Sequence, residues 1–393
     1  MKKARAASLA TAAVLAISAS AAFSASNPPI KIGVVTSLSG TLAGVGQPIR
    51  WGLELAVKEV NAAGGILGRP IELLVEDEEG NPSVAVQKAE KLVQLQKVDF
   101  ITGTVNSGST LAVGQVGERN NKLVSTTVSY ADSITADKCS PNVFRVNIRA
   151  EQQSVALAEW LARTKPKARV FYIGPDYEMG RSTVAAFKSV IEKKGLTSVG
   201  EFFAPLDSKD YTQYFGLVRA ARPDVIYTSV VGNDTIRLFS QMADFGLLQG
   251  LTLVGSAGVI TSQNIAAVGK SGDGFVSGSG YSPKIETPEN KKFVEAYRAA
   301  YKADPDTFAA DAYGMIYAYK AAAEKARSTD TDKLRAAFRG LAWQTPQGTK
   351  TIRAGDHQAM QDVFLVAVKA GQFDVIGKVN GPDAIGPDAC SRF

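Results

Sequence analysis

Side chains that commonly carry out catalysis are scarce in this sequence. His357 is the only histidine, so a Ser-His-Asp triad would have to rest on it, and a metal site built from several histidines is impossible. It lies in the polar segment 355–358, where we expect a structural role, with a hydrogen bond in a cleft as the alternative. The chain has no phosphate-binding loop of the form G-x-x-x-x-G-K-[ST] and no G-x-S-x-G nucleophile elbow. The sequence therefore favours binding over catalysis, and we expect that the protein is not an enzyme.

Four consecutive acidic residues, Glu76 to Glu79, could suggest a Ca²⁺ site. Neighbouring side chains on an extended chain point alternately to opposite faces, so these carboxylates do not converge on one ion. We therefore expect a solvated edge here, and neither a metal nor any other cofactor.

The N-terminus has the features of an export signal. The positive residues Lys2, Lys3 and Arg5 precede an apolar stretch over 6–17, and small residues follow up to Ala25. The apolar stretch is too short for a membrane span, which needs about 18 residues or more. No cysteine near the cleavage region could carry a lipid. Residues 1–25 are therefore predicted to be a cleaved signal peptide, and the mature protein to be periplasmic and not a lipoprotein.

The charge balance argues against one class of partner. The formal net charge of +6 falls by three when Lys2, Lys3 and Arg5 are removed, and the rest is spread along the chain without Lys/Arg blocks. A nucleic-acid-binding protein would show a basic patch or stripe. We therefore expect no nucleic-acid partner.

Cys139 and Cys390 are the only two cysteines. An even pair in an exported protein usually forms a disulfide. This one would tie the end of the chain back to its first half. A buried pair of free thiols is the alternative.

The spacing of apolar residues predicts alternating strands and helices. Residues 32–35 and 71–77 are typical of strands on either side of a helix over 49–60, which the glycines at 64 and 65 end. The rest of the first half is predicted to contain strands at 99–103, 123–126 and 143–146 and helices at 83–96 and 110–120. A second set follows, with strands at 170–174, 199–203, 225–230 and 251–255 and helices near 151–163, 181–194, 211–221 and 234–245. Such alternation indicates α/β lobes with parallel sheets.

Two amphipathic helices, 288–302 and 307–326, follow the second set and need a sheet face to cover. We expect them to return to the first lobe, and a β-rich end to follow at 349–353, 363–368 and 373–377. The predicted lobes are 26–147 plus 281–353, and 148–280 plus 354–380, with a tail over 381–393 that returns to the first lobe. The chain would cross between lobes near 147–150, 277–281 and 353–358, which predicts a hinge and a cleft at the strand ends.

Several stretches together carry a family resemblance. They are Ile32-Gly33-Val34-Val35, the run Val60-Asn61-Ala62-Ala63-Gly64-Gly65-Ile66-Leu67-Gly68-Arg69-Pro70-Ile71, the pair Phe144-Arg145, the turn Gly255-Ser256-Ala257-Gly258 and the helical Ala310-Asp311-Ala312-Tyr313. Over nearly the whole mature chain, the sequence resembles the leucine/isoleucine/valine-binding type of periplasmic solute receptor. These are type I periplasmic binding proteins that feed ABC importers. The resemblance implies two Rossmann-like lobes with parallel sheets, joined by a multi-strand hinge that closes on a small solute.

The resemblance places one half of the site on the first lobe. Ser107, in the loop after the third strand, matches the serine that holds the ligand's carboxylate in relatives with an amino-acid ligand. The exit of the next strand, Val128, Ser129 and Tyr130, matches the segment whose backbone also meets that group. Free N–H groups at a helix start suit an anion, and a hydroxyl adds one donor. A plain helix cap is the alternative for Ser107.

The second lobe departs from the family pattern. The acidic residue that holds a ligand's ammonium falls on Ala257, and the aromatic that joins it falls near Asn233, with Asp234 as an alternative source of charge. A buried ammonium without a carboxylate would be costly. This favours a carboxylate that lacks an ammonium, such as an aromatic or keto acid, or an amide, over a standard α-amino acid.

Aromatic residues complete the predicted site. Tyr177, at a strand-to-helix turn of the second lobe, could wall the ligand or lie on a surface loop. Tyr130, at a strand end, and Tyr281, at a crossover, are further candidates for the cleft, as is Trp51, for which packing is expected instead. Tyr313 and Tyr317, four apart on one helix face, are expected to lie in the core.

The predicted function is capture of a small carboxylate-bearing solute, an amino acid or an aromatic or keto acid, and delivery to the membrane subunits of an ABC permease by a monomeric receptor. An exported sensor that signals to a membrane partner without transport is the alternative. An exported hydrolase is a third reading, for which catalytic groups are missing.

Overall fold

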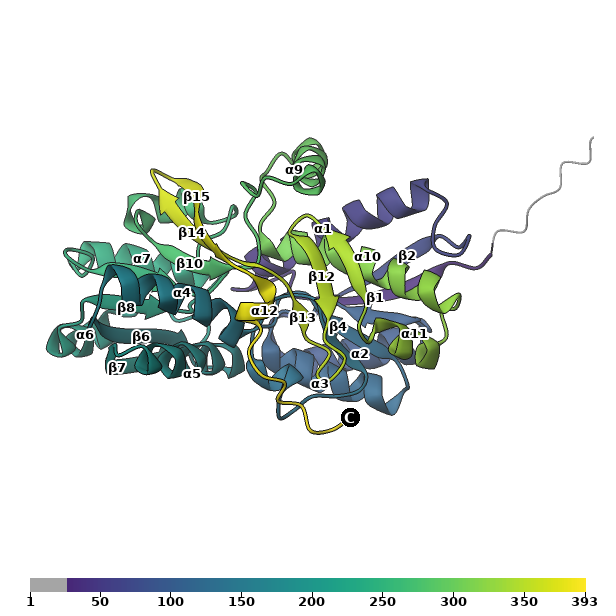
Figure 1. The fold of residues 1–393 in the computed structure, drawn as a ribbon, viewed down its shortest axis with the longest axis horizontal. Coiled ribbons are helices and arrows are strands. Elements are labelled where there is room, and N and C mark those ends of the chain that lie inside the picture. Colours follow the sequence, from purple (N-terminus) through teal and green to yellow (C-terminus); the bar gives the residue numbers. More distant parts are fainter. Residues whose placement is uncertain (1–26) are drawn as a thin grey trace, which may run out of the picture.

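The computed structural model describes residues 27–393, so the predicted signal peptide, residues 1–25, lies outside the described residues. Two sheets divide the molecule into two lobes (Figure 1), one built on β1 to β5 and the other on β6 to β10 with β14 and β15. The α/β fold predicted from the sequence is confirmed. We call these the first and the second lobe.

The first lobe contains a five-stranded, all-parallel sheet in the order β2-β1-β3-β4-β5. Its elements are β1 (Ile30–Thr36), α1 (Ala43–Ala62), β2 (Ile71–Asp77), α2 (Pro82–Gln94), β3 (Phe100–Thr102), α3 (Ser107–Arg119), β4 (Leu123–Thr126), the 3-10 turn η1 (Asp132–Thr135) and β5 (Val143–Arg145).

The second lobe repeats this order. Its strands run β15-β14-β10-β9-β8-β6-β7, and the five from β6 to β10 are parallel. Its elements are α4 (Ala150–Thr164), β6 (Arg169–Pro175), α5 (Glu178–Lys193), β7 (Thr197–Ala204), the 3-10 turn η2 (Thr212–Tyr214), α6 (Phe215–Ala221), β8 (Val225–Thr228), α7 (Asn233–Asp244), β9 (Thr252–Gly255), α8 (Ile265–Val268), the 3-10 turn η3 (Gly269–Gly272) and β10 (Val276–Ser279).

The last third of the chain contributes elements to both lobes. Its elements are α9 (Pro288–Tyr301), α10 (Thr307–Ala326), α11 (Thr331–Phe338), β11 (Ala342–Thr345), β12 (Gly348–Ile352), β13 (Ala359–Met360), β14 (Val363–Lys369), β15 (Gln372–Val379) and α12 (Gly381–Ala384). Helices α9 and α10 pack on α1, as expected, and β14 joins β10 in the second sheet. Strand β13 pairs with β12 in a separate three-stranded sheet.

Two further features of the fold have a clear physical reason, and the second differs from the sequence prediction. The hairpin β14–β15 is antiparallel because a two-residue turn, Ala370-Gly371, joins the strands, and both residues have positive φ, as tight hairpin turns require. Helix α1 begins at Ala43 and not at residue 49, although Gly44, Gly46 and Pro48 are poor helix formers. Gly46 is needed there, since a Cβ at this position would lie 1.8 Å from the carbonyl oxygen of Ser37.

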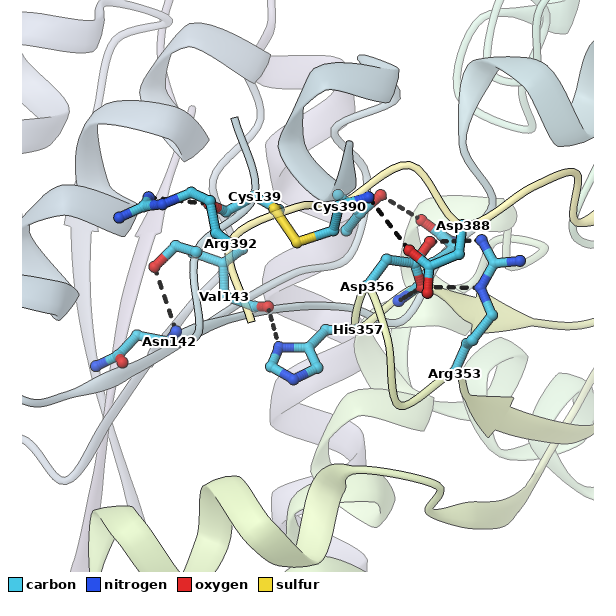
Figure 2. The surroundings of a disulfide bond; sticks show 12 residues. Cys139, Asn142, Val143, Arg353, Asp356, His357, Asp388, Cys390 and Arg392 are labelled. Atoms are coloured by element: carbon cyan, nitrogen blue, oxygen red, sulfur yellow. Dashed lines mark hydrogen bonds and ion pairs between the residues drawn. A yellow bond between two sulfur atoms is a disulfide. The ribbon is translucent and has the colours of Figure 1, made fainter. Parts of the chain in front are cut away.

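The predicted disulfide between Cys139 and Cys390 is confirmed, with Cα atoms 5.8 Å apart (Figure 2). The tail that carries Cys390 returns to the first lobe, where Arg392 donates to the carbonyl of Cys139 at 2.9 Å and pairs with Glu118 at 2.9 Å. In Figure 1 this yellow segment runs from α12 down to the C-terminus between the two lobes. The end of the chain therefore spans the junction and is anchored covalently on the first lobe.

Candidate functional site

The loop after β1 contacts the loops after β7 and β8, so the carboxyl ends of the parallel strands in the two sheets face each other. In an order of the 2-1-3-4-5 kind, ligands bind outside the carboxyl ends where the connections leave in opposite directions. These points lie between β1 and β3 in the first lobe and between β6 and β8 in the second. The loops that begin at residues 37, 103, 176 and 229 are therefore the ones that must build a site.

The lobes are closed on each other. Thr41 donates from its hydroxyl to Asp207 at 2.6 Å, and the main-chain N–H of Asn233 donates to the carbonyl of Thr41 at 3.2 Å. On the other side of the interface, the N–H of Asp132 donates to the hydroxyl of Ser182 at 2.9 Å. These bonds join loops from both lobes and therefore hold the lobes against each other.

Ser107 is fully buried at the first position of α3. It is not the helix cap, since Asn106 takes that role and accepts from the N–H of Gly108 at 2.8 Å. The hydroxyl of Ser107 accepts from the N–H of Ala131 at 3.3 Å, which ties the helix start to the loop after β4. The two first-lobe segments named by the sequence are therefore in contact.

In the loop after β4, only some of the groups named from the sequence are available to a ligand. Val128 and Tyr130 are buried at the loop. Ser129 turns its hydroxyl into the first lobe, where it bonds to the hydroxyl of Thr110 at 2.6 Å and donates to the carbonyls of Thr104 and Val105 at 3.2 and 3.1 Å. The side chain of Ser129 is therefore engaged in the fold, and only its backbone can serve a ligand.

Arg145 holds this loop in place through hydrogen bonds to its carbonyl groups, a role that the sequence did not reveal. It is fully buried and donates to the carbonyls of Ser129 at 2.9 Å and Ala131 at 2.7 Å and to the hydroxyl of Thr135 at 3.0 Å. Burial lowers the pKa of Arg145 to about 9. An arginine that ends a buried strand is a weak signal, because nothing in the sequence says which carbonyls it meets.

Buried hydroxyls without a partner gather at the strand ends of both lobes. In the described part of the chain, such atoms include those of Thr127 and Tyr130 in the loop after β4, Ser229 after β8 and Ser256 after β9. Each such group should find a hydrogen-bond partner, so hydroxyls at a ligand-binding edge are available to a solute. Of these four side chains, only that of Tyr130 was named from the sequence as a candidate for the site.

Tyr177 faces the interface from the second lobe. It lies immediately before α5 and is half-buried. Burial, followed by the charges of Asp234 and of Glu78 from the first lobe, raises its pKa above the usual 10. The ring therefore lies where both lobes can reach it and not on a free surface loop.

The acidic alternative at Asp234 is ruled out as a free partner for an ammonium. Asp234 is buried, pairs with Arg237 and accepts from the N–H of Asp207 at 2.8 Å. Asn233 next to it is exposed and lines an interlobe cavity of about 50 Å³ with Val45 and Phe308.

Ala257 is fully buried, and its N–H donates to Gln153 at 2.6 Å. The next residue, Gly258, has φ +82° and lies so close to Phe308 of α10 that a Cβ would be 2.4 Å from the ring. Since no carboxylate stands at residue 257, the second lobe cannot bind an ammonium at that point.

Glu78 is a site residue that the sequence misassigned. The expected solvated edge over Glu76 to Glu79 is wrong for Glu78, which is fully buried and accepts from the hydroxyl of Ser37 at 3.0 Å and from the N–H groups of Val105 and Asn106 at 2.8 and 3.2 Å. Burial raises its pKa to about 7. Alternation along the strand does hold, because Glu76 points outward to Lys88 and Lys91, and the turn after β2 is what carries Glu78 inward.

Tyr281 lies beyond β10, where the chain passes from the second lobe to the first. Its ring is buried, its hydroxyl has no partner, and it lines a second cavity of about 30 Å³ with Asp306 and Thr307. Trp51, in contrast, stacks on Tyr301 with ring centroids 5.0 Å apart, and Tyr313 and Tyr317 both donate to Glu59, at 2.6 and 2.7 Å. Those three aromatics pack, as predicted.

His357 is structural. Its ring is buried and stacked on Phe144, with centroids 4.0 Å apart, and its Nδ1 lies 3.2 Å from the carbonyl of Val143 (Figure 2). Burial lowers its pKa to about 4. Within residues 27–393, no group of three His, Cys, Asp or Glu side chains is placed to hold a metal ion, and no helix is long and apolar enough to span a membrane.

Comparison with known proteins agrees with this geometry. The family model described as periplasmic binding protein matches residues 29–372. The chain is 29% identical to the Leu/Ile/Val-binding protein homolog 3 of Brucella melitensis, over 84% of this chain and 88% of that protein.

Two solved structures are similar over most of their length. A solute-binding protein of an ABC transporter from R. palustris, in complex with benzoate, has a TM-score of 0.85 and 26% identity and covers 92% of this chain and 99% of its own. A second solute-binding protein from R. palustris, in complex with 4-hydroxybenzoate, has a TM-score of 0.83 and 25% identity. The match covers 91% of this chain and 98% of that protein. With a family match over most of the chain and two lobes that close on a set of unpartnered hydroxyls, this chain belongs to the periplasmic binding protein family, among relatives of the leucine/isoleucine/valine-binding type.

Proposed function

We propose that this protein is an exported receptor that holds one small organic carboxylate between its lobes and delivers it to an ABC importer. The carboxylate is placed at the start of α3, by the hydroxyl of Ser107 and the backbone of Val128, Ser129 and Tyr130. A helix N-terminus and converging donors suit an anion. The single observation that carries the proposal is the set of buried, unpartnered hydroxyls at the facing strand ends.

We favour an aromatic carboxylate over an α-amino acid. Residue 257 is alanine, and the carboxylate of Asp234 is taken by Arg237, so the second lobe offers no charge partner at the place where relatives hold an ammonium. The aromatic Tyr177 faces the interface from the same lobe, and relatives of similar fold are known in complex with benzoate and 4-hydroxybenzoate. A keto acid is the next choice, since it too lacks an ammonium.

A thermal-shift screen tests this proposal. Benzoate, 4-hydroxybenzoate, leucine, the keto acid of leucine and benzamide are added separately to the mature protein. A ligand that binds only the native state stabilises it by about 2.7 kcal/mol at one hundred times its Kd. We expect the aromatic acids to raise Tm and benzamide, which lacks the carboxylate, to leave it unchanged. A shift with leucine alone would contradict the aromatic class, and no shift with any carboxylate would contradict the proposal as a whole.

A variant locates the carboxylate. Ser107→Ala should weaken benzoate binding about tenfold, because a hydrogen bond to a charged group contributes about 1.5–3 kcal/mol. Ser140→Ala is the matched control, since that hydroxyl bonds to Glu118 on the far side of α3. Equal affinity in the Ser107→Ala variant and the wild type would remove Ser107 from the site.

Location and assembly belong to the same proposal. The disulfide fits an oxidising compartment, and the N-terminal residues fit a cleaved signal. We expect the mature protein in the periplasmic fraction, with an N-terminus near residue 26 by mass spectrometry and a monomer mass by light scattering. An intact residue 1 in the purified native protein would contradict export by cleavage.

A further inference from the structure

A second cavity opens at the N-terminus of α10. It holds about 30 Å³ and lies between Asp306 and Thr307 of the first lobe and the ends of β9 and β10 in the second. It shares Gly258 and Thr261 with the cavity lined by Val45 and Phe308. The two cavities are therefore neighbours along one interface.

The walls of this second cavity differ in character. The sheet of the second lobe contributes the apolar side chains of Phe275, Val366 and Val368, with Ser277 and Ser279 of β10 beside them. The opposite wall is polar and carries Asp306 and Tyr281. Such a pairing suits a group that has an apolar body and a polar tip.

Two buried polar atoms in this wall lack partners. The hydroxyl of Tyr281 has none, although only 3% of the residue is exposed. Asp306 uses one oxygen to cap α10, accepting from the N–H of Ala309 at 3.0 Å, and its other oxygen has no partner. Asp306 and Tyr281 both line this cavity. A bound group that donates a hydrogen bond could therefore satisfy the free oxygen of Asp306.

Within residues 27–393, no ion pair joins a lysine or arginine to Asp306. Lys350, the buried cation in this region, pairs with Asp311. Burial raises the pKa of Asp306 to about 7, and the charge of Asp311 acts in the same direction. The free oxygen is therefore suited to a neutral donor, which does not need a fully ionised carboxylate.

Tyr130 connects this cavity to the proposed site. The hydroxyl of Tyr130 lies near Thr307, which lines the cavity, and burial together with the charges of Asp311 and Asp306 raises its pKa. The backbone of the same residue belongs to the loop proposed to hold the carboxylate. A solute that contacts Tyr130 can therefore reach both the proposed carboxylate site and the second cavity.

We infer that Asp306 and Tyr281 form a subsite for a hydroxyl group that the solute carries at the end away from its carboxylate. The inference rests on the proposed function and narrows it to hydroxylated aromatic carboxylates. The solute hydroxyl donates to the free oxygen of Asp306 and accepts from Tyr281. A cavity of this size holds about two water molecules, which such a hydroxyl replaces.

Calorimetry with benzoate, 3-hydroxybenzoate and 4-hydroxybenzoate tests the subsite. The wild type should bind at least one hydroxybenzoate about tenfold more tightly than benzoate. Asp306→Asn keeps the capping oxygen and replaces the free one by a donor, so this preference should fall about tenfold while the affinity for benzoate stays within about threefold. Tyr281→Phe should reduce the preference in the same direction.

Tyr319→Phe is the matched control. It removes another buried, unpartnered hydroxyl, which lies against Phe100 in the core of the first lobe, and it should leave the preference unchanged. Near-wild-type Tm values for the Asp306→Asn and Tyr281→Phe variants show that both fold.

Three results would overturn the subsite, each in a distinguishable way. Equal affinity of the wild type for benzoate and both hydroxybenzoates, or a preference that survives both substitutions, overturns the subsite and leaves the proposed function standing. Leucine binding that Asp306→Asn alone abolishes would show that the oxygen serves an ammonium and not a hydroxyl. Failure of the wild type to bind any of these carboxylates overturns the proposed function together with the subsite.

Discussion

Thr41 in the loop after β1 donates from its hydroxyl to Asp207 in the loop after β7, at 2.6 Å, and so joins the two lobes across their interface. The same Thr41 accepts at its carbonyl from the N–H of Asn233. Hydrogen bonds from Lys209 and then from Thr41 lower the pKa of Asp207 to about 2, so the acceptor stays ionised at neutral pH. One residue of the first lobe thus meets two loops of the second in the closed state.

Replacing this threonine should favour the open state. Thr41→Val removes the hydroxyl and keeps the shape, so the closed state loses a hydrogen bond between the lobes and the apparent affinity for a solute should weaken. The expected result is a weaker Kd for a bound solute and a larger radius of gyration of the ligand-free protein in small-angle scattering. Ser208→Ala, whose hydroxyl bonds only within its own loop, serves as the control. An unchanged Kd and radius would show that this contact does not hold the lobes closed.

Arg145 should be essential for the shape of the carboxylate loop. Arg145→Met leaves the carbonyls of Ser129 and Ala131 buried without donors, which costs about 1–3 kcal/mol for each group. We expect the free energy of unfolding in urea to fall by about 3 kcal/mol and solute binding to weaken as well. Arg119→Met, which breaks an exposed pair with Glu90, should cost less than about 1 kcal/mol. Similar losses in the two variants would refute the special role of Arg145.

The disulfide should stabilise the protein by cross-linking distant parts of the chain. Cys139 and Cys390 are 251 residues apart, and loss of a native disulfide typically costs about 2–5 kcal/mol. We expect the Cys139→Ser/Cys390→Ser double variant, and the wild type under reducing agent, to unfold at lower urea. Phe393→Ala controls for the packing of the tail on His357. A double variant as stable as the wild type would contradict the prediction.

His357 should make stability fall on acidification. The unfolded chain binds the imidazole proton near pH 6.5 and the folded protein only near pH 4, so between these values the unfolded state holds more protons. Stability is therefore full above pH 6.5 and declines as the pH falls to 4, by on the order of 3 kcal/mol.

The measurement compares the wild type with His357→Asn across this pH range. Asparagine tolerates the positive φ of +58° at this position, and the chain has no other histidine. Glu78 and Asp306, whose raised pKa values favour the folded state at low pH, act in the opposite direction in both proteins. The difference between the two curves should grow from pH 4 to pH 6.5, and a constant difference would contradict the assignment.

The order of elements could be predicted from the sequence because it depends on local patterns. The two α/β sets were indicated by apolar strand segments, by glycines that end helices and by apolar residues at helical spacing. The position of Ser107 at a helix start followed from this order of elements together with the family resemblance. What failed locally were elements whose form depends on distant contacts. Helix α1 continues through Gly46 because the backbone at Ser37 comes close to it, and β10, which was missed, is short and rich in serine and glycine.

Side-chain partners were far less predictable than positions. Ser129 was correctly placed in the loop after β4, yet its hydroxyl turns inward to Thr110. Asp234 lies at the interface, yet Arg237 neutralises it. Glu78 stands in an acidic run and is the one member that is fully buried. In each case a tertiary contact, and not the residue type or spacing, decides whether the group is available to a ligand.

The most direct test is a crystal structure of the mature protein grown with 4-hydroxybenzoate. The account predicts one molecule between the lobes, its carboxylate within hydrogen-bond distance of the Ser107 hydroxyl and the backbone of Val128 to Tyr130, and the Tyr177 ring against it. A solute bound elsewhere, or an interface in which the hydroxyls of Thr127 and Ser256 are satisfied by the protein itself with no room for a guest, would contradict it.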